Sequence, residues 1–178
     1  MDWGLIQIIQ GNPKNFDFIG SSGDFISRAM EIEIDGDAPE EDMQQVFGWL
    51  RDFNHAENGP FMKALDTDAQ KEFTIVARDS DGNLLGGICG NTTFHWLKIE
   101  IMAVSPNHRR KGVGEHLVQA AEKHGSVNGC QHAYVDTISY QAPEFYRKLG
   151  YREVGRLPNW DSQGHDKLFF MKELQHDR

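Results

Sequence analysis

Apolar and polar residues alternate with a period of two along most of the second half of the chain, which is the pattern of half-buried β-strands. Six strands are expected there, at residues 73–78, 84–92, 96–104, 132–137, 151–156 and 168–172. Apolar spacing close to 3.6 residues predicts helices over 112–125 and 143–149. The stretch DSDGN at 79–83 is typical of a hairpin turn and should join the first two of these strands.

The first half of the chain shows weaker patterns. Residues 29–34 alternate and predict an edge or first strand, whereas 1–28 are hard to interpret beyond a candidate strand at 5–9. An amphipathic helix of about four turns follows, because four apolar residues fall at i, i+3, i+4 and i+7. They are Met43, Val46, Phe47 and Leu50. NHAENGP should end this helix, and 61–70 could hold a short second one.

This order of elements predicts an α/β fold of mixed α+β character. Hairpins in the middle of the chain, followed by two strand–helix crossovers, imply a central sheet that is antiparallel first and parallel later. At 178 residues the chain suits one domain. We expect residues 1–28 to be an N-terminal extension and 29–178 to form that domain.

Composition places the chain among soluble globular proteins, with 39% hydrophobic and 25% charged residues. The sequence has no apolar run near the roughly 20 residues that a membrane-spanning helix needs. The N-terminus has no basic flank, so we expect no secretory signal there. The two cysteines, Cys89 and Cys130, show no metal-ligand spacing. We expect a reduced, cytoplasmic protein with no metal and no membrane partner.

The net charge of −9 is unevenly distributed. Residues 1–95 carry 6 Lys+Arg and 17 Asp+Glu, a balance of −11, whereas 96–178 carry 12 and 10, a balance of +2. This division suggests two partners of opposite charge, although acidic surface also simply aids solubility. Nucleic acid is disfavoured as a partner, because phosphate-dominated binding requires a broad basic face and the cations here cluster in one turn.

That turn lies in residues 104–116, VSPNHRRKGVGEH, where a strand ends and a helix begins. Free N–H groups and the helix dipole favour an anion at such a helix N-terminus. Gly112 and Gly114 let the backbone approach a phosphate closely, and the run from Arg109 to Lys111 adds positive charge. A pyrophosphate fits these features. The P-loop pattern and the full G-x-G-x-x-G pattern are both missing.

The segment RRKGVG at 109–114 resembles the R/Q-x-x-G-x-G/A loop of the GNAT superfamily of acyl-CoA-dependent N-acyltransferases. The preceding IEIMAVSPNHR resembles the family's fourth strand, and EHLVQAAEKHGSVNGC resembles its cofactor helix. AYVDTISYQAPEFYRKLGYREVG resembles its fifth strand, fourth helix and sixth strand. The resemblance is specific over about 73–174, rests on element order over 29–72, and is absent over 1–28.

The resemblance implies a sheet that splays between the family's fourth and fifth strands, with coenzyme A bound there. Its pyrophosphate would lie on the N–H groups of residues 110–114, and its pantetheine arm would add to the strand that ends at 102–104. The cofactor-binding residues implied in this way are Met102, Ala103, Val104, Arg109, Arg110, Lys111, Gly112, Val113, Gly114, Glu115, Ser139, Ala142 and Tyr146.

Tyr146 is the catalytic residue that the resemblance indicates most directly. Ala142, Tyr146 and Gly150 reproduce the spacing of the family's fourth helix, where the tyrosine lies near the coenzyme A sulfur and can protonate it. The alternative is a tyrosine that merely packs on the sheet. Ser139 stands where many members have Asn, which makes the cofactor contacts there a point of departure from the family.

A base is also required, because an alkyl amine with a pKa of about 10 must lose a proton before it attacks. Lys98 stands where some members carry a catalytic Glu. Glu100 lies two residues on and shares a face with Lys98, so it can serve directly or through waters. It could equally be an ordinary carboxylate paired with Lys98. Asp136 is a second candidate.

The family's acceptor-facing segments correspond to residues 53–66 and 157–167, and the first is acidic and aromatic. We therefore expect an enzyme that transfers the acetyl group of acetyl-CoA to a primary amine of a cationic small molecule, by direct attack in a ternary complex. The alternative is a non-catalytic acyl-CoA-binding sensor of the same fold. A homodimer is compatible with the family.

Overall fold

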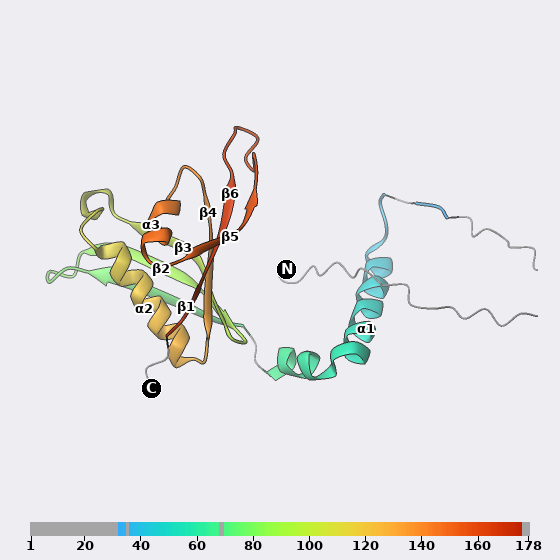
Figure 1. The fold of residues 1–178 in the computed structure, drawn as a ribbon. Helices are drawn as coiled ribbons and strands as arrows, with labels where there is room; N and C mark the ends of the chain where they lie inside the picture. The colour runs from blue at the N-terminus through green and yellow to red at the C-terminus, as the bar shows by residue number, and fades with distance from the viewer. Residues whose placement is uncertain (1–31, 35, 68–69, 176–178) are drawn as a thin grey trace, which may run out of the picture. The chain divides into compact units, whose positions relative to one another are not determined.

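The computed structural model describes residues 32–34, 36–67 and 70–175 (Figure 1). The chain divides into two units between Met43 and Gln44. The sheet and the helices that pack on it all belong to the unit that begins at Gln44. The elements in chain order are α1 (Glu40–Thr67), β1 (Lys71–Arg78), β2 (Leu84–Thr93), β3 (Trp96–Val104), the 3-10 helix η1 (Pro106–His108), α2 (Val113–Val127), β4 (His132–Ile138), α3 (Pro143–Lys148), β5 (Arg152–Leu157) and β6 (Lys167–Glu173).

The elements predicted between residues 73 and 172 are confirmed, with ends that differ by no more than two residues. The strand predicted at 29–34 is wrong over 32–34, which pair with no strand among the described residues and leave Ile32 and Ile34 exposed. Alternation alone cannot make a strand where no neighbour supplies hydrogen bonds. Residues 29–31 and the candidate strand at 5–9 lie outside the described residues.

Helix α1 contains the two predicted helices joined across a kink at Asn58, where φ is −147° and ψ is 63°. Asn58 Oδ1 accepts a hydrogen bond from the Phe61 N–H at 3.2 Å and so caps the second helix, which has Pro60 in its first turn. Residues 54–57, predicted to end the first helix, remain helical. The apolar side chains of the first part of α1 are not core residues, since Phe47, for example, is 44% exposed.

The sheet has the order β1-β2-β3-β4-β6-β5. β1, β2 and β3 pair antiparallel through short turns, and the crossover through α2 makes β3 and β4 parallel. The chain then crosses through α3 to the edge strand β5 and returns as β6 between β5 and β4, antiparallel to both. The predicted mixed sheet is confirmed, and its parallel pairing is that of β3 with β4.

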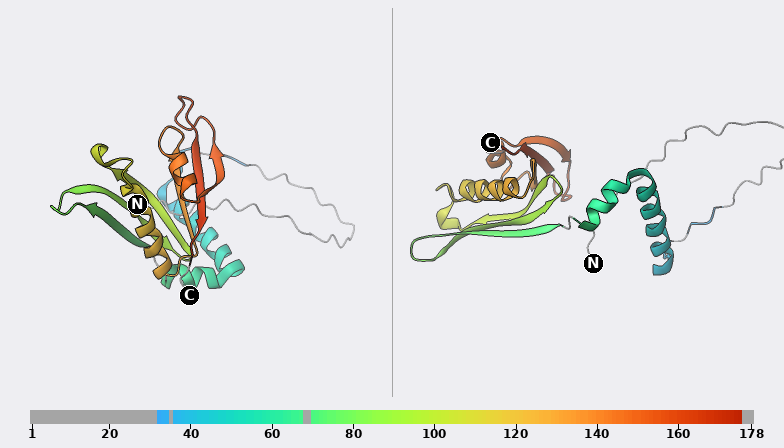
Figure 2. Two further views of the ribbon diagram at one scale, coloured as in Figure 1. Left: turned by 60° about the vertical axis from the view of Figure 1, so that its left-hand side comes forward. Right: turned by 90° about the horizontal axis from the view of Figure 1, so that it is seen from below.

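Helix α2 lies across one face of the sheet and packs on β1, β2 and β3, while α3 lies beside β5 (Figures 1 and 2). The core between them is formed by buried apolar side chains of both layers: Phe73, Ile88, Leu97, Ile99, Leu117, Val118, Ala121, Val135, Leu168 and Phe170. The start of α2 also meets α3, because a Cβ at Gly114 would lie only 3.3 Å from the Phe145 ring. Both helices therefore border the same part of the sheet.

Candidate active site

A β-bulge in β3 sets the geometry of the site. Cys89 of β2 is opposite Ile101, but the next residue, Gly90, is opposite Ile99, so Glu100 is an extra residue in β3. Ile99 is buried before the bulge and Met102 packs against the core after it. Glu100 and Ile101 are consequently both exposed, with Ile101 at 65%.

β3 and β4 separate directly at this bulge. Their pairing runs from Trp96/His132 to Ile99/Val135 and continues no further within the described parts of either strand, although β3 extends to Val104 and β4 to Ile138. We call residues 100–104 of β3 and 136–138 of β4 the splayed edges. Each has another strand on its far side, so the remaining main-chain amides and carbonyls face the other splayed edge and have no strand partner there.

The β3 splayed edge leads straight into the cationic turn. Arg109 folds back and its Nε donates to the Val104 carbonyl at 3.2 Å. Arg110 has φ of +61° and Gly112 has φ of +83°, so the backbone winds left-handed just before α2 begins. Because no side chain caps this helix start, its first N–H groups remain available to an anion.

Tyr146 lies in α3 and its side chain is buried, with 5% exposure. Its ring contacts those of Phe145, Tyr151 and Phe170 at centroid distances of 5.2, 5.6 and 6.3 Å. Burial, with a smaller contribution from the negative charge of Asp136, raises the pKa of Tyr146 to about 12. The phenol therefore stays protonated at neutral pH and is suited to donate a hydrogen bond or a proton.

This burial predicts a loss of stability in alkali. Ionisation of Tyr146 is suppressed in the folded state, whose pKa of about 12 lies above the ordinary value of 10. The associated stability is fully present below pH 10 and is lost as the pH rises towards 12, by about 2–3 kcal/mol. Urea unfolding midpoints measured across this range should fall. The fall should be smaller in Tyr146→Phe, and an equal fall in that variant would contradict the assignment.

Two neighbouring side chains, Lys98 and Asn91, contact the same carboxylate oxygen of Glu100. Lys98 Nζ lies 2.9 Å from its Oε1, and Asn91 Nδ2 donates to the same oxygen at 3.0 Å. Lys98 and Glu100 thus share a face as predicted, and the carboxylate raises the pKa of Lys98 chiefly through their hydrogen bond. Asn91, a buried polar residue opposite Lys98, was missed by sequence reasoning; the pairing register of β2 with β3 was needed to find it.

Asp136, on the β4 splayed edge, forms an ion pair with Lys167 at 2.9 Å. The same ammonium lies over the rings of Trp160 at 4.9 Å and Phe169 at 5.7 Å. Sequence reasoning proposed Asp136 but missed Lys167, which begins β6 and becomes a neighbour only because β6 inserts next to β4.

Ser139 and Gln141, which follow β4 directly, form hydrogen bonds on opposite sides of the chain where this strand ends. The Ser139 N–H donates to the Asp166 carbonyl at 2.8 Å, and its Oγ accepts from the Asp166 N–H, so both groups are engaged by the loop before β6. Gln141 Oε1 accepts from the Ile138 N–H at 2.8 Å. Because successive amides of a strand point to opposite sides and the Ser139 amide faces β6, the Ile138 amide faces β3. Gln141 therefore occupies the one amide that Ile138 presents on the β4 splayed edge.

Of the other predicted cofactor residues, Met102, Ala103 and Val104 belong to the β3 splayed edge itself. Met102 and Val104 pack against the core while Ala103 is exposed. Ala142 is the N-cap residue of α3. Glu115 lies in the first turn of α2 and accepts a hydrogen bond from Gln119 at 3.2 Å.

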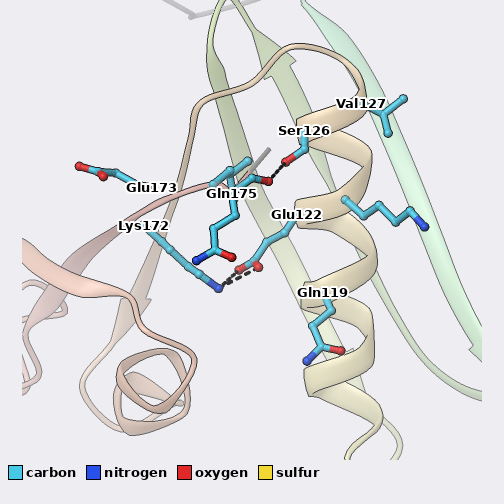
Figure 3. A pocket seen from close by; sticks show the side chains of 9 residues that line it. Gln119, Glu122, Ser126, Val127, Lys172, Glu173 and Gln175 are labelled. Atoms are coloured by element: carbon cyan, nitrogen blue, oxygen red, sulfur yellow. Dashed lines mark hydrogen bonds and ion pairs between the residues drawn. The ribbon is translucent and has the colours of Figure 1, made fainter. Parts of the chain in front are cut away.

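A separate hollow of about 620 Å³ lies between the C-terminal half of α2 and the end of β6 (Figure 3). Its main feature is the ion pair of Lys172 with both oxygens of Glu122, at 2.9 and 2.8 Å. Ser126 also donates to the Gln175 carbonyl at 3.3 Å. None of its lining residues belongs to the splayed edges or the cationic turn.

No group of three or more His, Cys, Asp or Glu side chains among the described residues could hold a metal ion. No described helix combines the length and apolar character required to cross a membrane.

The fold and these features define a class of protein. Residues 40–151 match the family model described as the acetyltransferase (GNAT) family. The chain therefore belongs to the GNAT acetyltransferase family, and the resemblance seen in the sequence is confirmed.

Individual relatives agree with this assignment. A blasticidin-S acetyltransferase of Streptomyces morookaense is 30% identical over 116 residues, 65% of this chain and 82% of that protein. An acetyltransferase of Agrobacterium fabrum is 30% identical over 88 residues, and this chain spans 64% of its length. The crystal structure of an acetyltransferase from Bacillus cereus has a TM-score of 0.63 and 27% identity, and the match covers 80% of this chain and 98% of that one.

Proposed function

We propose that this protein transfers the acetyl group of acetyl-CoA to a primary amine of a cationic small molecule, by direct attack within a ternary complex. The observation that carries the proposal is the loss of pairing between β3 and β4 after Ile99 and Val135. The unpaired β3 edge leads to an uncapped helix start behind three consecutive cations, and a protonated tyrosine lies in α3 beside the same region.

Acetyl-CoA binding follows from the main chain. The pantetheine arm, with two amides, adds to the β3 edge at Met102–Val104 as a strand would. The pyrophosphate then reaches the N–H groups of residues 110–114, where the α2 dipole and the side chains of Arg109–Lys111 stabilise it. On the β4 side, the amide of Ile138 is already satisfied by Gln141, so we assign the strand-like contacts to β3.

Transfer needs a proton acceptor at the amine and a proton donor at the sulfur. Glu100, exposed at the bulge, accepts the amine proton directly or through water, and the neutral nitrogen attacks the thioester carbonyl. As the C–S bond breaks, Tyr146 donates to the departing thiolate, and the second proton of the attacking nitrogen, lost once the C–N bond has formed, returns through water to the Tyr146 phenolate. A phenol with a pKa of about 12 gives up its proton only as the sulfur gains charge, so its donation belongs to the transition state.

A cationic acceptor is supported by the charges on the sheet face away from α2. Glu100 and Asp136 lie there on the two splayed edges, each with a lysine as its present partner. The name of the Streptomyces relative indicates that it acetylates a small molecule, blasticidin S, which supports a small-molecule acceptor for this chain as well.

The direct test combines binding and turnover. Isothermal titration calorimetry with acetyl-CoA should give one site per chain, and a panel of amines including polyamines and blasticidin S should release free thiol from acetyl-CoA. Binding without thiol release for any amine would favour the non-catalytic sensor. An absence of binding at millimolar acetyl-CoA would exclude both functions.

Neutralising the cationic turn should weaken acetyl-CoA binding. In the triple variant Arg109→Gln, Arg110→Gln, Lys111→Gln, we expect Kd to rise by roughly 10–100-fold, because charge-assisted hydrogen bonds contribute about 1.5–3 kcal/mol each and solvent screens part of that. Calorimetry at two salt concentrations checks this, since the variant should also lose most of the salt dependence. Lys123→Gln, at the other end of α2, is the matched control and should bind as the wild type does.

A further inference from the structure

Lys167 is positioned at the end of the splayed edges. In the register of β4 with β6 it is opposite Ile138, and its side chain lies on the same sheet face as that of Asp136. Its ammonium is 2.9 Å from the Asp136 carboxylate and lies over the indole of Trp160. The side chain is 23% exposed, so it is held in place yet still open to small molecules.

Asp136 connects this ammonium to the place where the acyl group would lie. It is the first residue of β4 after the pairing with β3 ends at Val135. Tyr146 lies near the same point of the sheet, because its ring contacts Phe170 at 6.3 Å and Phe170 is opposite Val135 in the pairing of β4 with β6. A thioester bound between the splayed edges at this point would lie beside Asp136, and so beside the Lys167 ammonium that pairs with it.

We propose that Lys167 is a self-acetylation site, modified by acetyl-CoA bound to the same chain; this inference rests on the proposed function. The Lys167 ammonium gives a proton to Asp136, which passes it to water, and the neutral Nζ attacks the thioester carbonyl carbon. A C–N bond forms and the C–S bond breaks. The coenzyme A thiolate takes a proton from Tyr146, and the second proton of Nζ, lost once the C–N bond has formed, returns through water to the Tyr146 phenolate. The products are Nε-acetyl-lysine and free coenzyme A.

Acetylation would change the acceptor side of the site. The acetylated Nζ is neutral, so it forms no ion pair with Asp136 and no cation–π contact with Trp160. A carboxylate and an indole face are then left free for the ammonium group of an incoming acceptor. In this respect Lys167 occupies the position that a cationic substrate would take.

Lys98 provides an internal comparison. It also faces away from α2 and forms an ion pair at 2.9 Å, with Glu100, and its side chain is 35% exposed. It differs in position, because it lies opposite Tyr134 within the stretch where β3 and β4 are still paired. Lys98 should therefore stay unmodified under conditions that acetylate Lys167.

The experiment is a time course of the purified full-length chain with acetyl-CoA and no amine, followed by intact mass and peptide mapping. We expect one acetyl group per chain, on Lys167, at a rate per molecule that does not change on dilution. The product should be absent from Lys167→Arg, at least tenfold slower in Tyr146→Phe, and unchanged in Lys123→Arg, which alters a lysine at the far end of α2.

Calorimetry with acetyl-CoA on the same preparation distinguishes a failure of self-acetylation from a failure of the proposed function. If acetyl-CoA binds and an amine is acetylated but Lys167 stays unmodified, the self-acetylation proposal is wrong and the proposed function stands. Acetyl groups on Lys98, groups spread over many lysines, or a rate that falls on dilution would also overturn self-acetylation. If no acetyl-CoA binds, both proposals fail.

Discussion

Replacing Tyr146 with Phe should lower kcat about 100-fold while leaving the affinity for acetyl-CoA nearly unchanged. The hydroxyl is removed from a buried site whose ring contacts are with Phe145, Tyr151 and Phe170, and a phenylalanine preserves those contacts. General acid catalysis contributes typically 10²–10⁴-fold, and water can supply part of the lost proton transfer. Steady-state thiol release at saturating acetyl-CoA, with calorimetry for Kd, measures the two quantities separately.

Tyr140→Phe is the matched control for that experiment, because Tyr140 is 63% exposed and lies outside α3. It should retain kcat within about twofold. An unchanged kcat in Tyr146→Phe would assign Tyr146 to packing alone. A large rise in the Kd for acetyl-CoA would instead make it a binding residue.

The alternation of apolar residues was sufficient to predict the sheet strands, because each has one face on the core and the other exposed. The helix start near Gly112 could also be predicted, because two glycines and three consecutive cations occur together within six residues. In both cases the information lies within a few neighbouring residues. The cationic turn was predicted from such a signal, whereas Tyr146 was predicted from the resemblance of residues 142–150 to the family's fourth helix.

The features that were missed depend on which strands become neighbours. Lys167 and Asp136 are 31 positions apart and meet only because β6 inserts beside β4. Asn91 reaches Glu100 only because β2 and β3 share a particular register. The apolar residues of α1 are a further example: their spacing predicted a helix, but it could not show that their side chains would be exposed, because exposure depends on what packs against the helix.

Glu100 illustrates how two sequence interpretations can both hold. It is paired with Lys98, as an ordinary strand carboxylate would be, and it also lies at the bulge where β3 and β4 part. An ion pair between half-exposed groups contributes little to stability, about 0–1 kcal/mol. The pairing is therefore no obstacle to a role in proton transfer, because the lysine can move away when a substrate ammonium arrives.

Gly90→Ala should destabilise the protein by about 3–5 kcal/mol, the largest stability effect that we expect of a single methyl group. Gly90 lies opposite Ile99 at the bulge, and a Cβ there would be 1.9 Å from the Lys98 carbonyl oxygen and 3.1 Å from the Phe73 ring. The oxygen is backbone, so no rotamer change relieves the clash and the two strands must move apart. Thermal unfolding should show a midpoint lowered by roughly 10 °C.

Gly87→Ala, in the same strand, is the control for this change. A Cβ at Gly87 would be 3.4 Å from its nearest neighbours, an ordinary contact, so its midpoint should shift by no more than a few degrees. Equal midpoints for the two variants would show that the bulge tolerates a side chain. If Gly90→Ala folds at low temperature, it should also lose affinity for acetyl-CoA, since the strand shift that relieves the clash moves the β3 splayed edge away from the start of α2.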